Sequence, residues 1–153
     1  MAEAAVADGR LSVEDYLAEG ARRGVVWTEQ RYEVLLLLWN LARPVGAYDA
    51  AARLSAGKAH VHATSVYRCF HCLEGAGLVM RVVSWNRYML IPDPAVSIWG
   101  ILLCKGCGTC YPIDLSREYA GLAWRVKTQG FDPSAYTVEC GGRCRRCLAE
   151  EAP

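Results

Sequence analysis

The sequence of 153 residues lacks a long hydrophobic run. Its longest apolar stretch, around Val34–Trp39, is far shorter than the roughly 20 residues that a membrane-spanning helix needs. The first ten residues are rich in alanine and include Glu3 and Asp8, which does not fit a secretory or arginine-rich targeting signal. We therefore expect a cytoplasmic protein that does not associate with membranes.

The sequence also lacks an excess of charge of one sign. Its 17 Lys and Arg residues oppose 16 Asp and Glu residues, which leaves a formal net charge of +1. This balance neither requires nor excludes a nucleic-acid partner. The hydrophobic fraction of 53% is sufficient for packed cores and argues against wholesale disorder. A chain of this length can form one large domain or two small ones.

Motifs that support catalysis are missing as well. The sequence contains no glycine-rich phosphate loop, no Cys-His-Asp arrangement and no paired-carboxylate motif. We therefore expect that the protein is not an enzyme.

The pattern over residues 1–91 predicts a winged helix-turn-helix domain. Apolar spacing predicts helices over Val13–Gly24, Glu29–Ala42 with Thr28 as N-cap, Ala47–Ala56 closed by Gly57, and from Thr64 or Ser65 to Gly75. Two strands, Leu78–Val83 and Arg87–Ile91, are predicted around a turn at Ser84–Asn86. Short helices followed by a two-stranded hairpin are the order of elements in a winged helix-turn-helix.

A second unit is expected after Pro92-Asp93-Pro94, which predicts a hinge. The expected boundaries are 1–91 for the first domain, 92–94 for the hinge and 95–153 for a small α/β domain. In that domain we expect strands over Ser97–Cys104 and Ala135–Cys140, and between them a helix capped by Asp114 that ends near Gly130. The predicted fold class is therefore α+β.

Four of the eight cysteines form two Cys-x-x-Cys units, Cys104/Cys107 and Cys144/Cys147. In a chain without a secretion signal, such pairs are typical of metal ligands rather than disulfides. Together they predict one structural zinc ion per chain, held by four thiolates with no open position for a catalytic water. Gly108 and Gly141-Gly142 are expected to allow the tight turns of the two units.

The other cysteines and the histidines have several possible roles. Cys110 and Cys140 could form a second sulfur site or a redox pair, but we favour small apolar residues beside the zinc site. Cys69 and Cys72 lie at i and i+3 of the fourth predicted helix, where core packing is favoured over a metal half-site. We expect His60, His62 and His71 to contact solvent or phosphate rather than a metal.

Several short motifs occur in an order that is characteristic of one family. They are Thr28-Glu29-Gln30-Arg31, Ala47-Tyr48-Asp49, Ser65-Val66-Tyr67-Arg68, Gly77-Leu78-Val79, Cys104-x-x-Cys107-Gly108 and Gly130-Phe131…Glu139…Gly142-x-Cys144-x-x-Cys147. On these motifs, residues 13–147 resemble the ferric uptake regulator family, and within it most closely the zinc uptake regulators.

The resemblance implies a homodimeric transcriptional repressor that binds a double-stranded DNA operator. It has an N-terminal winged helix domain and a C-terminal dimerisation domain. Tyr48, Ser65, Tyr67 and Arg68 match the motifs that reach DNA in the family. The planar guanidinium of Arg68 can pair with guanine O6 and N7 in the major groove. The wing arginines Arg81 and Arg87 can hold the DNA backbone.

The chain departs from the family at the regulatory metal site. Met80, Ile91 and Pro112 stand where the resemblance implies a His, a Cys and a Glu ligand, and Pro92–Gly100 contains no histidine. None of these three residues binds zinc well. We therefore expect DNA binding with structural zinc but without the family's metal-sensing switch.

Three alternatives remain open at this point. The protein could be a zinc-responsive repressor whose ligands come from Cys110, Cys140, Asp93 or the histidines. It could be a thiol-based redox sensor that uses Cys69/Cys72 or Cys110/Cys140. It could also be an interaction module that keeps the dimer fold without binding DNA, although the presence of Tyr48, Tyr67 and Arg68 argues against this.

Overall fold

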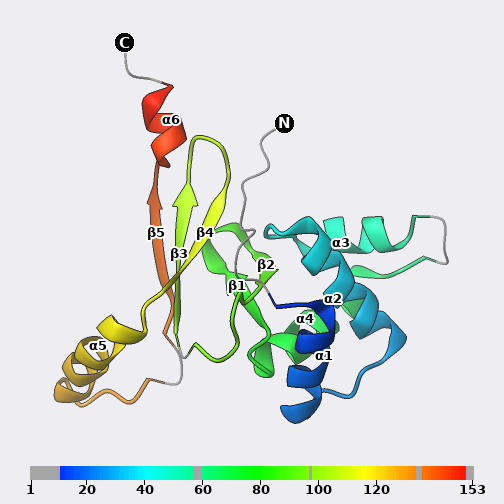
Figure 1. Cartoon of the computed structure of the whole chain (residues 1–153), viewed down its shortest axis with the longest axis horizontal. Coiled ribbons are helices and arrows are strands. Elements are labelled where there is room, and N and C mark those ends of the chain that lie inside the picture. Colours follow the sequence, from blue (N-terminus) through cyan, green and yellow to red (C-terminus); the bar gives the residue numbers. More distant parts are fainter. Residues whose placement is uncertain (1–10, 57–59, 97, 134–135, 151–153) are drawn as a thin grey trace. The chain divides into compact units, whose positions relative to one another are not determined.

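The computed structural model of the chain describes residues 11–56, 60–96, 98–133 and 136–150 (Figure 1). The chain divides into two compact units, Met1–Pro94 and Ala95–Pro153. Residues 92–94 therefore belong to the N-terminal unit. Within the described residues, no helix is both long enough and apolar enough to cross a bilayer.

Four helices open the N-terminal unit: α1 (Val13–Arg22), α2 (Glu29–Leu41), α3 (Ala47–Leu54) and α4 (Ala63–Gly75). The predicted N-cap of α2 is confirmed, since the Thr28 hydroxyl accepts a hydrogen bond from the Arg31 amide. A capping box between Ser12 and Asp15, which the sequence analysis missed, starts α1.

A hairpin of β1 (Val79–Val82) and β2 (Arg87–Leu90) follows as the wing. The strands are antiparallel, with Val79 opposite Leu90 and Val82 opposite Arg87. A short 3-10 turn over Val83–Trp85 and a left-handed Asn86 connect them. Two backbone hydrogen bonds between Val45 and Tyr88 tie the wing to the segment between α2 and α3.

The core of the N-terminal unit lies between α2, α4 and the wing. Its buried side chains include Val34, Leu35 and Leu38 from α2, and Val66, Phe70 and Leu73 from α4. Tyr88 from β2 stacks on Phe70, with ring centroids 4.4 Å apart. The spacing of the α4 residues agrees with the predicted apolar face. The face opposite to it is left for solvent or a ligand.

The start predicted for α4 is wrong. The helix begins at Ala63, one residue before Thr64 and two before Ser65. His62 occupies the N-cap position without a side-chain cap. The third helix ends at Leu54, earlier than predicted, and Gly57 and Lys58 lie outside the described residues.

In the C-terminal unit, a three-stranded sheet has the order β4-β3-β5. β3 (Trp99–Cys104) pairs antiparallel with β4 (Cys110–Asp114) and parallel with β5 (Val138–Gly142). Between β4 and β5 lies α5 (Ser116–Thr128), and α6 (Arg145–Ala149) follows β5. The predicted N-cap is displaced by one residue, because Leu115 occupies the N-cap position of α5, while the Asp114 carboxylate before it accepts a hydrogen bond of 2.8 Å from the Ser116 amide.

Several boundaries in this unit differ from the prediction. β4 and α6 were not predicted, and β5 lies later than the predicted strand over Ala135–Cys140. Ser97 and Ala135, where the two predicted strands begin, lie outside the described residues.

Candidate metal centre and nucleic-acid interface

Four sulfur atoms meet at one end of the C-terminal unit. Cys104, Cys107, Cys144 and Cys147 each offer a Sγ atom, and these atoms all lie within 4.8 Å of one another. Cys104 and Cys147 are 3.8 Å apart at Sγ, and Cys107 and Cys144 are 3.7 Å apart. The cluster joins segments that are 40 residues apart in the chain.

Two local structures position these sulfurs. Cys104 is the last residue of β3, and a turn with a left-handed Gly108 carries Cys107 back toward it. Cys144 precedes the first turn of α6, and Cys147 lies within that turn. Helical spacing, rather than a glycine turn, therefore brings the second pair together. The predicted role of Gly141-Gly142 is wrong, because these residues end β5 in extended backbone.

Gly106 is required here for a reason that the sequence analysis missed. A Cβ atom at Gly106 would lie 2.9 Å from Cys147 Sγ, closer than real contacts allow. A side chain at this position would therefore push the second pair of sulfurs away from the first.

Hydrogen-bond donors prepare the cluster for negative charge. The backbone amide of Cys107 and that of Cys144, which lies 3.2 Å from Cys104 Sγ, hold the pKa of Cys104 down to about 6. The Thr109 hydroxyl lies 3.1 Å from Cys107 Sγ and lowers the pKa of that thiol. By contrast, burial raises the pKa of Cys147 to about 12. The surroundings thus favour the thiolate form of Cys104 and Cys107 and disfavour that of Cys147.

The arrangement fits a tetrahedral zinc ion. A Zn–S bond of about 2.3 Å gives neighbouring sulfurs a separation of about 3.8 Å in a regular tetrahedron. The two shortest pairs in the cluster match this separation. Among the described residues, these four cysteines are the one group of three or more Cys, His, Asp or Glu residues that could hold a metal.

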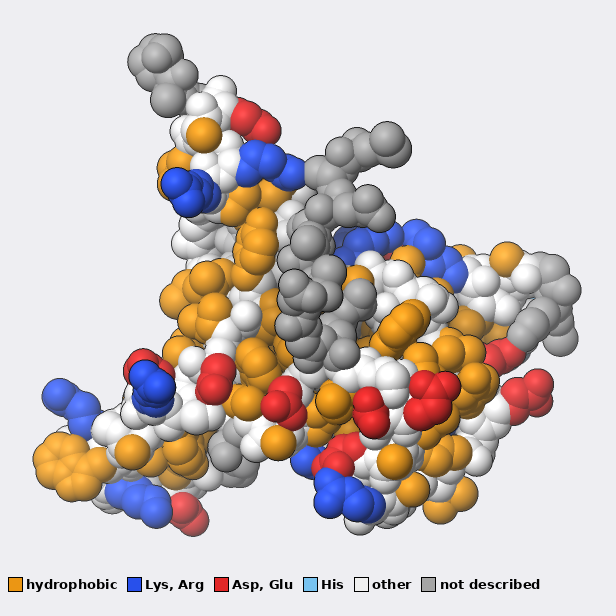
Figure 2. Space-filling view, in the orientation of Figure 1, with side chains coloured by type: hydrophobic (Ala, Val, Ile, Leu, Met, Phe, Trp, Pro, Cys, Tyr) orange, Lys and Arg blue, Asp and Glu red, His pale blue; other side chains and the backbone are white. Residues whose placement is uncertain are grey.

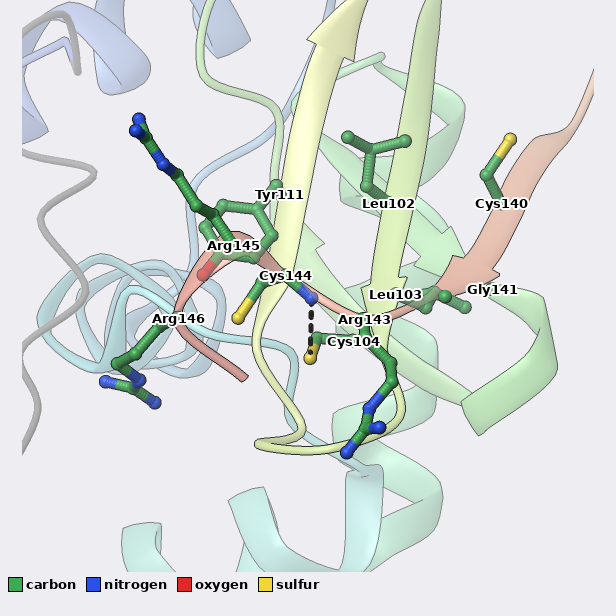
Figure 3. Close-up of a pocket in the computed structure, with 11 residues that line it drawn as sticks. Leu102, Leu103, Cys104, Tyr111, Cys140, Gly141, Arg143, Cys144, Arg145 and Arg146 are labelled. Carbon is green, nitrogen blue, oxygen red and sulfur yellow. Dashed lines mark hydrogen bonds between the residues drawn. The ribbon is translucent and has the colours of Figure 1, made fainter. Parts of the chain in front are cut away.

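A cavity of about 510 Å³ lies beside the cluster (Figure 3). Leu102, Tyr111 and Cys140 line it from β3, β4 and β5, and Arg143, Arg145 and Arg146 extend from the segment that carries Cys144. The three guanidinium groups point in different directions in Figure 3, so they do not converge on one ligand.

The remaining cysteines do not form a second sulfur site in the described structure. Cys110 pairs with Leu103 and Cys140 with Leu102 in the sheet, so the two thiols point to opposite faces. Cys110 is buried as expected, whereas Cys140 is exposed and is not part of a packed apolar cluster. In the N-terminal unit, Cys69 belongs to the core and Cys72 packs against it, in agreement with the structural role predicted for both.

The outer face of the N-terminal unit carries the side chains predicted to reach DNA. Arg68 on α4 is exposed, Ser65 and Tyr67 are half-buried, and Tyr48 on α3 is 77% exposed. The rings of Tyr48 and Tyr67 meet edge to face, with centroids 6.4 Å apart. We call these four residues, which lie on α3 and α4, the α3–α4 face.

The two wing arginines differ in how firmly they are held. Arg81 donates a hydrogen bond of 2.7 Å to the Asn86 side chain, and its guanidinium lies 6.0 Å from the centre of the Tyr88 ring. Arg87 is exposed at the start of β2. Both provide positive charge on the hairpin.

The residues that replace the expected regulatory ligands lie on three segments. Met80 is half-buried on β1, Ile91 directly follows β2, and Pro112 lies within β4. None of them offers a nitrogen, sulfur thiolate or carboxylate ligand.

Known proteins with this architecture were found by sequence and by structure, although no protein-family model matches the chain. The zinc uptake regulation protein of Escherichia coli K12 is 28% identical over 149 residues, which cover 94% of this chain and 87% of that protein. A solved zinc uptake regulator in complex with zinc and DNA has a TM-score of 0.82 at 25% identity, covering 93% of this chain and 99% of the other.

A second solved structure, described as holo XcZur, has a TM-score of 0.78 at 26% identity and covers 90% of this chain and 99% of its own. These likenesses and the four-cysteine cluster define the class, a two-domain winged helix regulator. In sequence and in fold the chain is similar to the zinc uptake regulators of the ferric uptake regulator family. These relatives are regulators and not enzymes, in agreement with the prediction.

Thiol exposure leads to a first prediction. Iodoacetamide at pH 8 should modify Cys140 fastest and Cys110 and Cys69 slowest, because burial raises the pKa of the latter two thiols and the thiolate is the reactive form. Peptide mass spectrometry of the native, zinc-loaded protein would measure the order. Equal rates at Cys110 and Cys140 would contradict the burial described above.

Proposed function

We propose that the protein is a homodimeric, sequence-specific transcriptional repressor that holds one structural zinc ion per chain and lacks the family's usual regulatory metal site. The observation that carries the proposal is the α3–α4 face. There α4 buries Val66, Phe70 and Leu73 and leaves Arg68 exposed beside the paired rings of Tyr48 and Tyr67.

DNA recognition by this face follows from the chemistry of its side chains. The guanidinium of Arg68 can form two parallel hydrogen bonds to a guanine in the major groove. Tyr48 and Tyr67 can pack on a thymine methyl group or bond to phosphate, and Ser65 can donate to phosphate. A solved relative at 25% identity is described as a complex with zinc and DNA, which supports the same use of this fold here.

Binding of the DNA backbone is assigned to the wing. Arg81 and Arg87 lie on the two strands of a short hairpin, and each can neutralise a phosphate. Because phosphate contacts are independent of base sequence, the wing contributes affinity while α4 contributes specificity.

Zinc in the C-terminal unit has a structural role in this proposal. Four sulfurs complete a tetrahedral shell and leave no position for substrate or water. The second metal site of the family is not expected, since Met80, Ile91 and Pro112 replace its ligands.

Dimerisation is supported by apolar surface that one chain leaves uncovered. No residue of α5 is buried. Leu122 is 40% exposed and Trp124 is 68% exposed on this helix, and Phe131 just after it is 64% exposed. Figure 2 shows hydrophobic side chains over the outer surface of α5. A helix with this much exposed apolar surface is typical of a subunit interface, and in this family a second copy of the chain is the expected partner.

Removal of one zinc ligand is the second prediction. Cys104→Ser should abolish zinc binding and unfold the C-terminal unit or break the dimer, because the binding energy of a structural zinc, on the order of 10 kcal/mol, is also folding energy. Elemental analysis and analytical ultracentrifugation measure the two effects, and Cys140→Ser serves as the control. Zinc-free wild-type protein with four freely titrating thiols would refute the structural site.

The third prediction tests whether Arg68 recognises bases. Arg68→Ala should weaken binding to the specific operator by roughly 1–3 kcal/mol and leave non-specific binding nearly unchanged. Arg87→Ala should weaken binding to all sequences alike and reduce the slope of log K against log salt concentration by about one. Fluorescence anisotropy on operator and random duplexes compares the two variants. Equal losses on both duplexes for Arg68→Ala would exclude base reading by this residue.

Zinc dependence gives the fourth prediction. Once the structural site is filled, added zinc should change operator affinity by less than about tenfold, which corresponds to ~1.4 kcal/mol of coupling. A ligand shifts a conformational equilibrium only when it binds the two states with different affinity, and the bridging ligands that would create this difference are replaced. A titration of zinc into zinc-loaded protein with anisotropy readout measures the coupling. A larger gain in affinity would reveal a sensory site built from other residues.

A further inference from the structure

The segment that leaves the winged helix is fastened to α1 by a buried tyrosine. Tyr16 is fully buried, and its hydroxyl donates a hydrogen bond of 2.6 Å to the Ile91 carbonyl oxygen. The Pro92 carbonyl oxygen lies 3.3 Å from the same hydroxyl. Tyrosine hydroxyls that are buried require a partner, and here the partner is the backbone directly after β2.

An arginine at the end of α1 fastens the same segment further along. Arg23 donates one hydrogen bond of 2.7 Å to the Pro94 carbonyl oxygen and another of 3.1 Å to the Ala76 carbonyl oxygen. Its Nε bonds to the Glu19 carboxylate at 2.5 Å, which orients the guanidinium. Arg23 thus joins α1, the end of α4 and the last residue of the N-terminal unit.

Gly77 leaves room for this arginine. Its φ of +68° places it in the left-handed region, and a Cβ atom there would lie 2.7 Å from an Arg23 nitrogen. Glycine is therefore favoured at this position by the left-handed backbone and also by the space that the Arg23 side chain occupies.

Few residues separate the carbonyl groups that Tyr16 and Arg23 hold from the C-terminal sheet. The Ile98 carbonyl oxygen already accepts a hydrogen bond from the Leu115 amide within the second unit. Three residues, 95–97, lie between the anchored Pro94 carbonyl and Ile98. A short connection that starts from a fixed carbonyl allows fewer orientations of the units than a long connection that starts from a free one.

We propose that Tyr16 and Arg23 are positioning residues that hold residues 91–94 on the winged helix and thereby restrict how the two DNA-reading heads of a dimer are presented. This inference rests on the proposed DNA-binding function. The restriction is supplied by hydrogen bonds inside the N-terminal unit, so it does not require a bridging metal.

Arg22 provides a matched control for Arg23. Both arginines lie at the end of α1, and both pair with Glu19. Arg22 donates a hydrogen bond to Glu19, whereas Arg23 also donates to the carbonyl oxygens of Ala76 and Pro94. Arg22→Gln and Arg23→Gln therefore remove the same charge from the same helix end, and only the second releases the segment.

The experiment has two readouts, made on the full zinc-loaded chain. Hydrogen exchange is followed in the peptide that covers residues 91–96. Binding is measured on a duplex with two half-sites, selected by the wild-type protein from a random pool, and on the same duplex cut to one half-site. Arg23→Gln and Tyr16→Phe should each speed exchange and weaken two-half-site binding by about tenfold, the loss expected from a buried or charged hydrogen bond, with half-site binding almost unchanged.

Arg22→Gln should leave both readouts at the wild-type level. A variant that simply destabilises the winged helix would lose half-site binding too, and Tyr16→Phe gives a second route if Arg23→Gln folds poorly. The inference is overturned if exchange does not change, or if it speeds up without a selective loss on the two-half-site duplex. If the wild-type protein selects no duplex, the proposed function fails instead, and the exchange comparison still decides whether the segment is held.

Discussion

The C-terminal unit brings four sulfur atoms together across 40 residues of chain, and in the proposed repressor its stability depends on the zinc ion that they would hold. Its own apolar core is small: among the described residues of this unit, the buried hydrophobic side chains are Ile98, Ile101, Leu103, Cys104, Cys110 and Cys147. Two of these six are members of the sulfur cluster itself. Units of this size rarely fold on hydrophobic burial alone, and in the proposed repressor a zinc ion that joins the end of β3 to the segment after β5 would supply further stabilisation. The sheet order agrees with this role, because β3 ends at one pair of cysteines and its parallel neighbour β5 leads to the other.

The N-terminal unit is built on a different principle. Its helices enclose a continuous core with fully buried side chains from α1, α2, α4 and the wing, so it needs no metal to fold. In the proposed repressor the two units therefore differ in what stabilises them, which is packing in the N-terminal unit and zinc coordination in the C-terminal unit. In the proposed repressor, the part that reads DNA is then independent of zinc, and zinc governs whether two such parts are joined.

Much of this arrangement could be predicted from the sequence, and the exceptions have physical causes. Regular apolar spacing located α2 and the buried face of α4, and the spacing of the two Cys-x-x-Cys units identified the sulfur cluster. β4 could not be predicted because its first residue, Cys110, follows a cysteine-rich turn and Pro112 interrupts the pattern of strand-forming residues. α6 is only 5 residues long and lacks a side-chain cap. The requirement for Gly106 arises from a contact with Cys147, which no local pattern contains.

Tyr88 contacts three structural elements of the N-terminal unit. Its backbone pairs with Val45 ahead of α3, its ring stacks on Phe70 of α4, and Arg81 of the wing lies over that ring. These contacts join helix, wing and connection, so little conformational entropy would remain to be lost when the proposed repressor docks on DNA. Association of such a preorganised surface should proceed with a small change in heat capacity, in contrast to DNA-binding segments that fold only on contact.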